Sequence, residues 1–173
     1  MIGDYGVSFE PDLPIYLTTE LLFFEIVDPQ RSIMRVNTIF HNRETDEDPS
    51  WFIMFSMPNC HHCTEVKPEI HRLAAHYHSQ ENAGLNFRVA EVDCTNEAAE
   101  DICMYFGHNK LPKFTVLDPA TDSFYMYPTK SPRLFEQFVE FSQGGFSESF
   151  VQGEIPRTYE GWDLTYRQMR YQF

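Results

Sequence analysis

Cys60 and Cys63 stand two residues apart in the sequence, with His61 and His62 between them. Two thiols at this spacing can act as a redox couple, supply half of a zinc site or form a purely structural disulfide. A zinc site needs a second pair of ligands, and the sequence has no second C-x-x-C and no H-x3-H pair. The pattern therefore favours redox chemistry, in which Cys60 attacks as a thiolate and Cys63 releases the substrate from the mixed disulfide.

The residues on both sides of the cysteines predict a strand, a turn and a helix. Residues 51–55 form a short apolar run that is typical of a buried strand, and Pro58 breaks it. A helical pattern follows over residues 64–78, with apolar residues near one face. A helix N-terminus has unpaired N–H groups and the positive end of the helix dipole. This order of elements therefore favours a thiolate at Cys60, nearer to solvent than Cys63.

The stretch resembles the active site of the thioredoxin superfamily, and more closely that of protein disulfide isomerase-like domains, here with a C-H-H-C motif. Pro58 lies two residues before Cys60, as in these proteins, and His62 lies directly before Cys63, as in the isomerases. Pro68 stands five residues after Cys63, where these families have a proline in the helix. The resemblance implies thiol–disulfide oxidoreductase chemistry on protein thiols and disulfides.

The downstream sequence extends the resemblance. Residues 89–117 are similar to the isomerase segment that carries a strand, a helix and a cis-proline loop, and Leu111 and Pro112 match that loop. The resemblance covers about residues 15–142 and implies an α/β thioredoxin-like fold, a central mixed β-sheet flanked by helices on both faces. It also implies that the backbone before Pro112 binds substrate as an added strand. The alternative is an ordinary trans proline at the start of a strand.

The resemblance assigns roles to two cationic side chains. A protonated His62 would stabilise the Cys60 thiolate, and the alternative is a solvated imidazole, which applies equally to His61. Arg133, near the start of the last helix, would approach the site and stabilise a thiolate at Cys63. The alternative for this arginine is a surface ion pair with Glu136.

Cys94 lies just before a predicted helix at residues 96–106, and Cys103 lies within it. Some resembling isomerase domains carry a cysteine pair here, which implies a structural disulfide in an oxidising compartment. The alternative is two buried free thiols.

Two positions depart from the family pattern. The family has a buried acid six residues before the first cysteine, which accepts the proton of the second thiol, and this sequence has Met54 there. The aromatic residue that usually precedes the first cysteine is Asn59. Methionine cannot transfer protons, so we expect slower proton transfer at Cys63 unless water or Glu91 substitutes for the acid.

The chain divides into three predicted segments. Residues 1–14 are an extended N-terminal arm, and residues 15–142 are the thioredoxin-like domain, with an insertion at about 29–50. Residues 143–173 are a C-terminal docking tail. Both arms carry aromatic residues, which in the C-terminal tail are interleaved with Arg157, Arg167 and Arg170, a composition that predicts protein partners. The domain elements are expected in the order βαβαβαββα. The strands are expected at 15–17, 51–55, 87–92, 113–117 and 123–127, and the helices at 20–27, 64–78, 96–106 and 133–142. A second helical piece is expected at 30–43, within the insertion.

The composition of the chain excludes some classes of function. The formal net charge is −13, which argues against nucleic acid as a partner. The sequence has no apolar run near the ~20 residues of a membrane helix, so no transmembrane segment is expected. Neither a resident metal nor a cofactor is predicted.

The first residues lack the features of a secretory signal or a transit peptide. The expected location is therefore the secretory lumen of the endoplasmic reticulum if a signal has been removed, and otherwise an organelle such as the mitochondrion.

Overall fold

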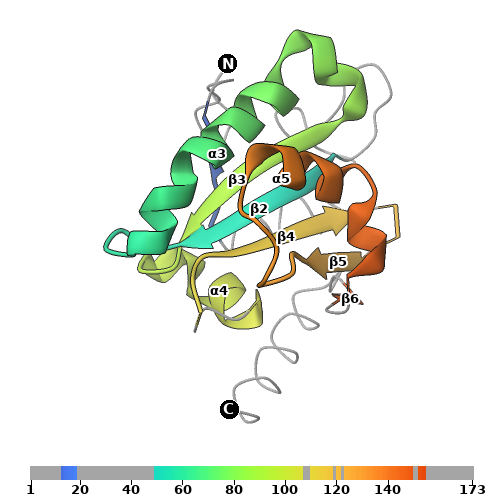
Figure 1. The fold of residues 1–173 in the computed structure, drawn as a ribbon. Helices are drawn as coiled ribbons and strands as arrows, with labels where there is room; N and C mark the ends of the chain where they lie inside the picture. The colour runs from blue at the N-terminus through green and yellow to red at the C-terminus, as the bar shows by residue number, and fades with distance from the viewer. Residues whose placement is uncertain are drawn as a thin grey trace.

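A mixed six-stranded sheet is the centre of the computed structural model, which describes residues 13–18, 49–106, 110–118, 120–121, 123–149 and 152–154. Helices lie on both faces of this sheet (Figure 1), as the sequence predicted. The elements in chain order are β1 (Ile15–Tyr16), β2 (Ser50–Ser56), α3 (His61–His78), η2 (Gln80–Leu85), β3 (Phe87–Asp93), η3 (Glu97–Ala99), α4 (Glu100–Phe106), β4 (Lys113–Asp118), β5 (Ser123–Met126), α5 (Phe135–Ser142), η4 (Gly145–Glu148) and β6 (Gln152–Glu154).

The strand before the cysteines lies in the middle of the sheet. The strand order is β1-β3-β2-β4-β5-β6, in which β2 pairs in parallel with β3 and antiparallel with β4. Residues 51–55 of β2 are at most 1% exposed, which explains why this run is apolar at every position. The chain leaves β2 at its C-terminal end and enters α3 after a short turn, so the cysteine pair stands at the edge of the most buried part of the sheet.

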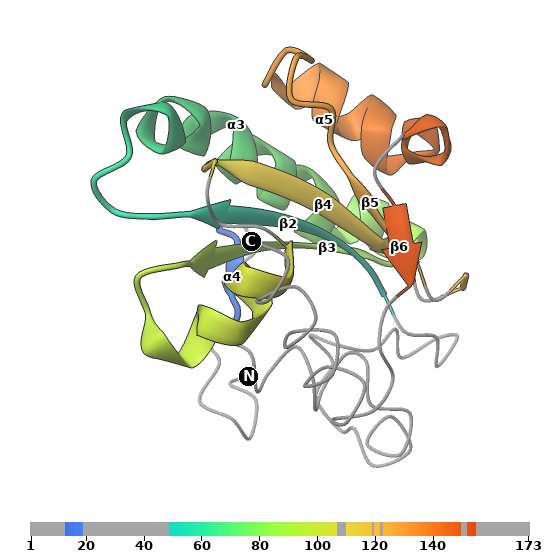
Figure 2. The same ribbon diagram turned by 90° about the horizontal axis from the view of Figure 1, so that it is seen from below.

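The side chains of β2 alternate between two apolar cores. Phe52 and Met54 point to the core beneath α3 and α5, while Trp51, Ile53 and Phe55 point to the core beneath α4. Figure 2 shows this layered arrangement, with α3 and α5 on one side of the sheet and α4 on the other. Two cores around one central strand make β2 a rigid base for the turn that carries the cysteines.

The helix α3 forms where the sequence predicted a helix. Its buried residues recur at helical spacing and include Val66, Ile70, Leu73 and Tyr77. Pro68 lies in the second turn, where it is accommodated within the helix, and the chain becomes extended at Ser79. Within the described residues, no helix is both long enough and apolar enough to cross a membrane.

The beginning of the predicted C-terminal tail is part of the domain. The β6 strand pairs antiparallel with β5, and the ring of Phe146 packs against Tyr125 with a centroid distance of 4.8 Å. The sequence analysis predicted neither this strand nor this contact. The domain packing therefore continues to residue 154, beyond the predicted boundary at residue 142.

Several predicted segments fall outside the described residues. They are most of the N-terminal arm, the helices expected at residues 20–27 and 30–43, most of the insertion at 29–50, and residues 155–173 of the docking tail. The described part of the segment before β2 includes β1, which pairs with β3 at one edge of the sheet. The edge strand predicted at residues 15–17 is thus found at residues 15–16.

Candidate redox site

Cys60 is the N-cap residue of α3. Its backbone is extended (φ −99°, ψ 115°), and its sulfur accepts a hydrogen bond from the backbone N–H of Cys63 at 3.2 Å. The carbonyl of Cys60 also accepts hydrogen bonds from the backbone N–H and the hydroxyl of Thr64, both at 3.0 Å. The first turn of the helix is therefore built around Cys60, with its sulfur at the positive end of the helix dipole.

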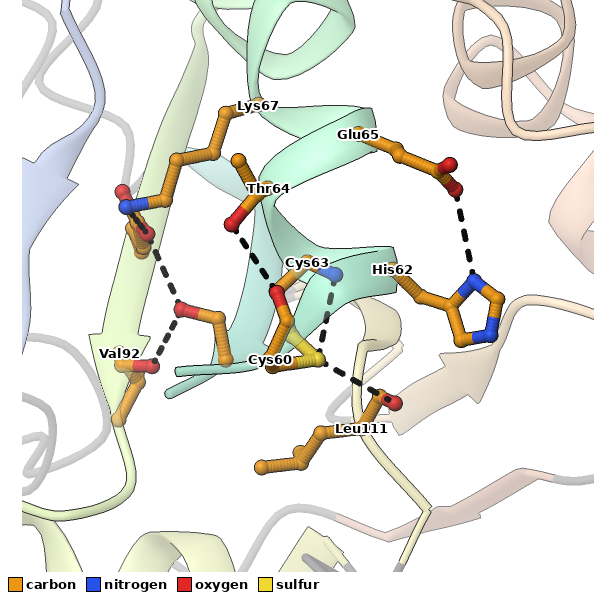
Figure 3. The surroundings of a disulfide bond; sticks show 10 residues. Cys60, His62, Cys63, Thr64, Glu65, Lys67, Val92 and Leu111 are labelled. Carbon is orange, nitrogen blue, oxygen red and sulfur yellow. Dashed lines mark hydrogen bonds and ion pairs between the residues drawn. A yellow bond between two sulfur atoms is a disulfide. The ribbon is translucent and has the colours of Figure 1, made fainter. Parts of the chain in front are cut away.

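Cys60 and Cys63 form a disulfide in the structure, with their Cα atoms 5.1 Å apart (Figure 3). Cys60 is 7% exposed and Cys63 is fully buried, so the first sulfur is the one that a substrate can reach, as predicted. Both cysteines belong to the apolar core beneath α3, together with Met54. Water is thus largely excluded from Cys63, and a proton that leaves its thiol must cross this apolar core.

The loop before β4 faces the cysteine pair. The peptide bond between Leu111 and Pro112 is cis, as expected from the sequence, and the Leu111 carbonyl oxygen lies 3.8 Å from the sulfur of Cys60. In the disulfide this sulfur has no hydrogen to donate, whereas a reduced Cys60 thiol can donate to the same carbonyl. The loop thus places backbone polar groups beside the sulfur that would meet a substrate.

The two histidines between the cysteines turn towards solvent. Nε2 of His61 lies 3.0 Å and Nδ1 of His62 lies 3.4 Å from the carboxylate of Glu65, and both imidazoles are exposed. Figure 3 shows the ring of His62 directed towards Glu65 and away from the disulfide. Sequence reasoning missed Glu65 as the partner of these rings, although its spacing of three and four residues on the helix is the signal for such pairs.

Arg133 lies near the buried Tyr127 hydroxyl, and its charge lowers the pKa of this tyrosine. Burial has the larger effect in the opposite direction, and the resulting pKa is about 12. The carboxylate of Glu136 contacts Arg72 at 3.8 Å, so the surface pair with Arg133 that we considered as the alternative is not found among the described residues.

The second cysteine pair is also joined. Cys94 and Cys103 form a disulfide with Cα atoms 5.7 Å apart, which ties the end of β3 to α4. A hollow of about 260 Å³ lies beside it, lined by Cys94, Thr95, Asn96, Glu97, Glu100, Cys103 and Met104. Cys103 contributes to the core beneath α4, so this bond fixes a short helix onto the sheet.

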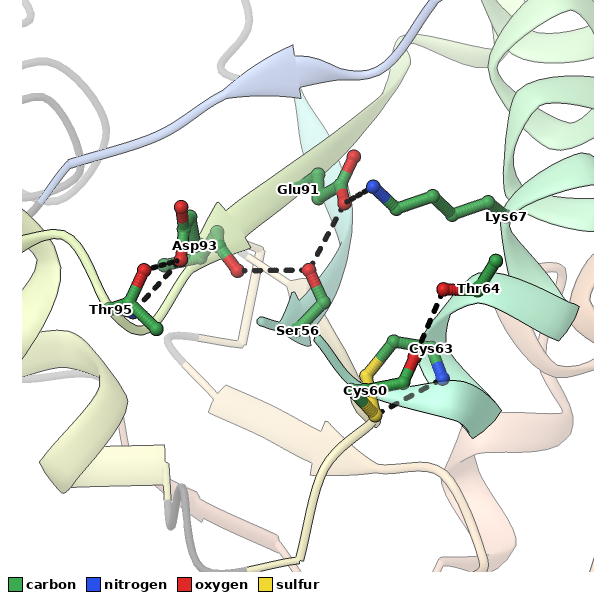
Figure 4. A network of polar contacts seen from close by, with 9 residues as sticks. Ser56, Cys60, Cys63, Thr64, Lys67, Glu91, Asp93 and Thr95 are labelled. Atoms are coloured by element: carbon green, nitrogen blue, oxygen red, sulfur yellow. Dashed lines mark hydrogen bonds and ion pairs between the residues drawn. A yellow bond between two sulfur atoms is a disulfide. The ribbon is translucent and has the colours of Figure 1, made fainter. Parts of the chain in front are cut away.

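A buried carboxylate, that of Glu91, lies in β3 near the cysteine pair (Figure 4). Glu91 in β3 is 2% exposed, its Oε1 accepts a hydrogen bond from the Ser56 hydroxyl at 3.0 Å, and Nζ of Lys67 lies 3.5 Å from the same oxygen. Figure 4 shows Glu91, Ser56 and the disulfide at the same end of β2. The sequence analysis named Glu91 only as a substitute for the missing acid. Its signal was a charged residue between the apolar residues Ala90 and Val92 in the interior of the strand.

No metal centre is evident near these side chains. Among the residues that the structure describes, no group of three or more His, Cys, Asp or Glu side chains is arranged to hold an ion. The arrangement that remains is a cysteine pair at a helix N-terminus, faced by a cis-proline loop, on a mixed sheet with helices on both faces. These features together define a thioredoxin fold with a C-x-x-C site.

The sequence comparison assigns the family. The thioredoxin family model matches residues 32–139, so the chain belongs to the thioredoxin family.

Solved structures show the same fold. The first two thioredoxin domains of Naumovozyma dairenensis Eps1p match with a TM-score of 0.54 and 20% identity, over 78% of this chain and 41% of that chain. The corresponding fragment of Saccharomyces cerevisiae Eps1p gives 0.54 and 17%, over 82% and 44%. The first thioredoxin domain of mouse protein disulfide-isomerase A4 gives 0.52 and 16%, over 86% and 85%. The chain thus spans less than half the length of the Eps1p fragments.

Proposed function

We propose that this protein is a thiol–disulfide oxidoreductase of the disulfide isomerase type, which acts on protein thiols and disulfides through Cys60 and Cys63. The observation that carries the proposal is the position of the Cys60 sulfur. It caps α3, it is the more exposed of the two sulfurs, and it faces the Leu111 carbonyl of the cis-proline loop. A thiolate at this place is stabilised by the helix N-terminus and remains accessible to a substrate disulfide.

The proposed reduction of a substrate proceeds in two exchanges. The Cys60 thiolate attacks one sulfur of the substrate disulfide, which forms a mixed disulfide and releases the other substrate sulfur as a thiolate. Cys63 then loses its proton and attacks Cys60, which closes the disulfide seen in the structure and releases the second substrate sulfur. The protein gives up two electrons and the proton of Cys63, and an external dithiol, or two external thiols, returns it to the reduced form. Oxidation of a substrate dithiol is the same sequence in reverse.

The other predicted residues fit supporting roles in this reaction. The backbone at Leu111 and Pro112 would pair with the substrate chain beside its reacting sulfur. His62 would stabilise the Cys60 thiolate after its ring turns from Glu65 towards the sulfur. Arg133 would act on Cys63 only after leaving the neighbourhood of Tyr127. In the oxidised site His62 contacts Glu65 and Arg133 lies near Tyr127, so both proposed roles belong to another state of the site.

A redox titration with an activity assay tests the proposal. The full chain is equilibrated in buffers of reduced and oxidised dithiothreitol, and the state of Cys60–Cys63 is read by alkylation and peptide mass spectrometry. Insulin reduction is measured in parallel, with Cys60→Ala and Cys63→Ala as controls. We expect a reversible two-electron transition and insulin reduction that both variants lose. A pair that stays oxidised under reducing conditions, or a wild-type chain without activity, would contradict the function.

A further inference from the structure

We infer that Glu91 is the proton acceptor for Cys63 in this protein, and that the acid missing at Met54 is supplied from the neighbouring strand. The inference rests on the proposed function, because it concerns the second exchange of that reaction. The observations behind it are the contacts of the Glu91 carboxylate with Ser56 and Lys67, and the strand register that places Glu91 beneath α3.

The strand register brings Glu91 to the position beside Met54. The two residues are partners in the parallel pairing of β2 with β3, and paired residues point to the same face of a sheet. Met54 shares the core beneath α3 with the buried Cys63. The carboxylate of Glu91 therefore lies on the sheet face that α3 covers, next to the place where a side chain from position 54 would meet Cys63.

The helix contact supports the same placement. Lys67 follows Cys63 by four residues on α3, so the two side chains leave the same side of the helix. Nζ of Lys67 lies 3.5 Å from Oε1 of Glu91. The helix face that carries Cys63 is thus the face that meets Glu91.

The carboxylate has an open acceptor position. Oε1 is held by Ser56 and Lys67, whereas the buried Oε2 has no hydrogen-bond partner among the residues that the structure describes. A carboxylate oxygen without a partner has lone pairs open to accept a hydrogen bond or a proton. Ser56, Lys67 and the hydroxyl of Tyr16 hold the carboxylate in place, and Oε2 remains the oxygen without a hydrogen-bond partner among the described residues.

The groups that face Glu91 come from every element packed against it. Tyr16 approaches from β1, Lys67 from α3 and Ser56 from β2, while Asp93 lies two residues further along β3. The negative charge of Glu91, followed by burial, raises the pKa of Tyr16. Asp93 also acts on Tyr16, whereas its Oδ1 accepts hydrogen bonds from the backbone and hydroxyl of Thr95. Asp93 therefore has its own partners at the surface and serves as a matched control for the loss of one negative charge.

The proposed step keeps atoms and charge in balance. The S–H bond of Cys63 breaks, its proton passes to Oε2 of Glu91 by way of water, and its sulfur forms a bond to Cys60. The bond between Cys60 and the substrate sulfur breaks, and that sulfur leaves as a thiolate. Glu91 is then neutral and returns its proton to solvent. Since Cys60 attacks as a thiolate that already exists, the first exchange does not involve Glu91.

The test separates the two exchanges. Reduced full chain is mixed with 5,5′-dithiobis(2-nitrobenzoate) and quenched with acid at set times between pH 5.5 and 10. Peptide mass spectrometry then counts chains with nitrobenzoate on Cys60 and chains with a closed Cys60–Cys63 bond. We expect Glu91→Gln to leave the first step unchanged and to slow the second by roughly 100-fold near neutral pH, the size of a general-base effect. Asp93→Asn should close at the wild-type rate.

The pH profile excludes a merely structural role. The Glu91→Gln deficit should shrink as the pH rises towards 10, because hydroxide then takes over the removal of the thiol proton. The double variant Met54→Glu/Glu91→Gln, which returns a carboxylate from the paired position, should recover most of the rate and provides the second test if Glu91→Gln does not fold. Closure of Glu91→Gln at the wild-type rate, an equal deficit at every pH, or a folded double variant without recovery would overturn the inference. A wild-type chain that never closes Cys60–Cys63 would instead contradict the proposed function.

Discussion

The sulfur of Cys60 accepts a hydrogen bond from the backbone N–H of Cys63 at 3.2 Å, so the pair is linked at the helix terminus by a polar contact as well as by its disulfide. In the reduced protein this N–H remains available to a negative sulfur at Cys60. Hydrogen bonding to the charged form and the helix dipole both favour a thiolate there. The same geometry leaves the Cys63 sulfur inside the core, without this stabilisation.

The first prediction follows from this asymmetry. Iodoacetamide at pH 6.5 should modify Cys60 of the reduced chain at least about tenfold faster than Cys63, because the thiolate is the reactive form and Cys63 is fully buried. In Cys63→Ala, mixed disulfides with a substrate peptide should accumulate at Cys60, since the second exchange is lost. Timed alkylation with peptide mass spectrometry measures both effects. Equal modification of the two cysteines would contradict the assignment of Cys60 as the nucleophile.

The second prediction concerns the ionisation of Tyr127. Burial raises its pKa to about 12, above the ordinary tyrosine value, so the folded state favours the neutral phenol. The contribution to stability is complete below about pH 10 and is lost as the pH rises from there towards 12, because the unfolded chain ionises first. Arg133→Ala should raise the pKa of Tyr127 further, since the arginine charge favours the phenolate. Carbon NMR of ring-labelled tyrosine gives the pKa, and a pKa that is unchanged or lower in Arg133→Ala would contradict the interaction.

The third prediction concerns the close contact between β6 and β5. A Cβ at Gly153 would meet the ring of Phe124 at 2.6 and 2.7 Å, so Gly153→Ala should force this ring or the strand to move. We expect the free energy of unfolding to fall by roughly 1–3 kcal/mol, the usual cost of overpacking. Urea unfolding measures the loss, and hydrogen exchange should show faster exchange in residues 152–154. Gly84→Ala is the control, because nothing lies within 4 Å of its added Cβ.

The fourth prediction concerns the disulfide between Cys94 and Cys103. Replacing both cysteines by alanine should lower the free energy of unfolding by about 2–3 kcal/mol, the value expected for a bond that closes a loop of this length. The Cys60–Cys63 redox potential should stay unchanged. Urea unfolding and a redox titration provide the two measurements. The single variant Cys94→Ala also lacks the bond, so a much smaller loss there would assign the effect to the packing of Cys103.

The fifth prediction concerns the part of the tail beyond β6. Removal of residues 155–173 should leave the fold and the thiol chemistry intact, because in the described part of the chain the last paired strand ends at Glu154. If the tail is the docking segment that its sequence predicts, this removal and Trp162→Ala should each abolish association with partner chains in the native source. Native mass measurement and size-exclusion chromatography decide the matter. Unaltered association after the truncation would leave the tail without a docking role.

Local patterns in the sequence determined most of the fold and the centre of the site. The apolar run at residues 51–55, the break at Pro58 and the helical periodicity after Cys63 each act over a few residues. They therefore predicted a strand, a turn and a helix that opens on Cys60, and β2 and α3 confirm them. The match around Leu111 and Pro112 likewise predicted which loop faces the cysteines.

The tertiary structure alone decided which distant residues meet. Sequence periodicity does not specify that β3 pairs with β2 in the register that sets Glu91 beside Met54, because register depends on the packing of the whole sheet. The position of Arg133 near Tyr127 likewise depends on how α5 packs on the sheet. The added strand β6 is only three residues long, and such a segment becomes a strand only when an existing edge offers it hydrogen bonds. Contacts of this kind join residues that are far apart in the chain, and they form only when the sheet and its two cores are complete.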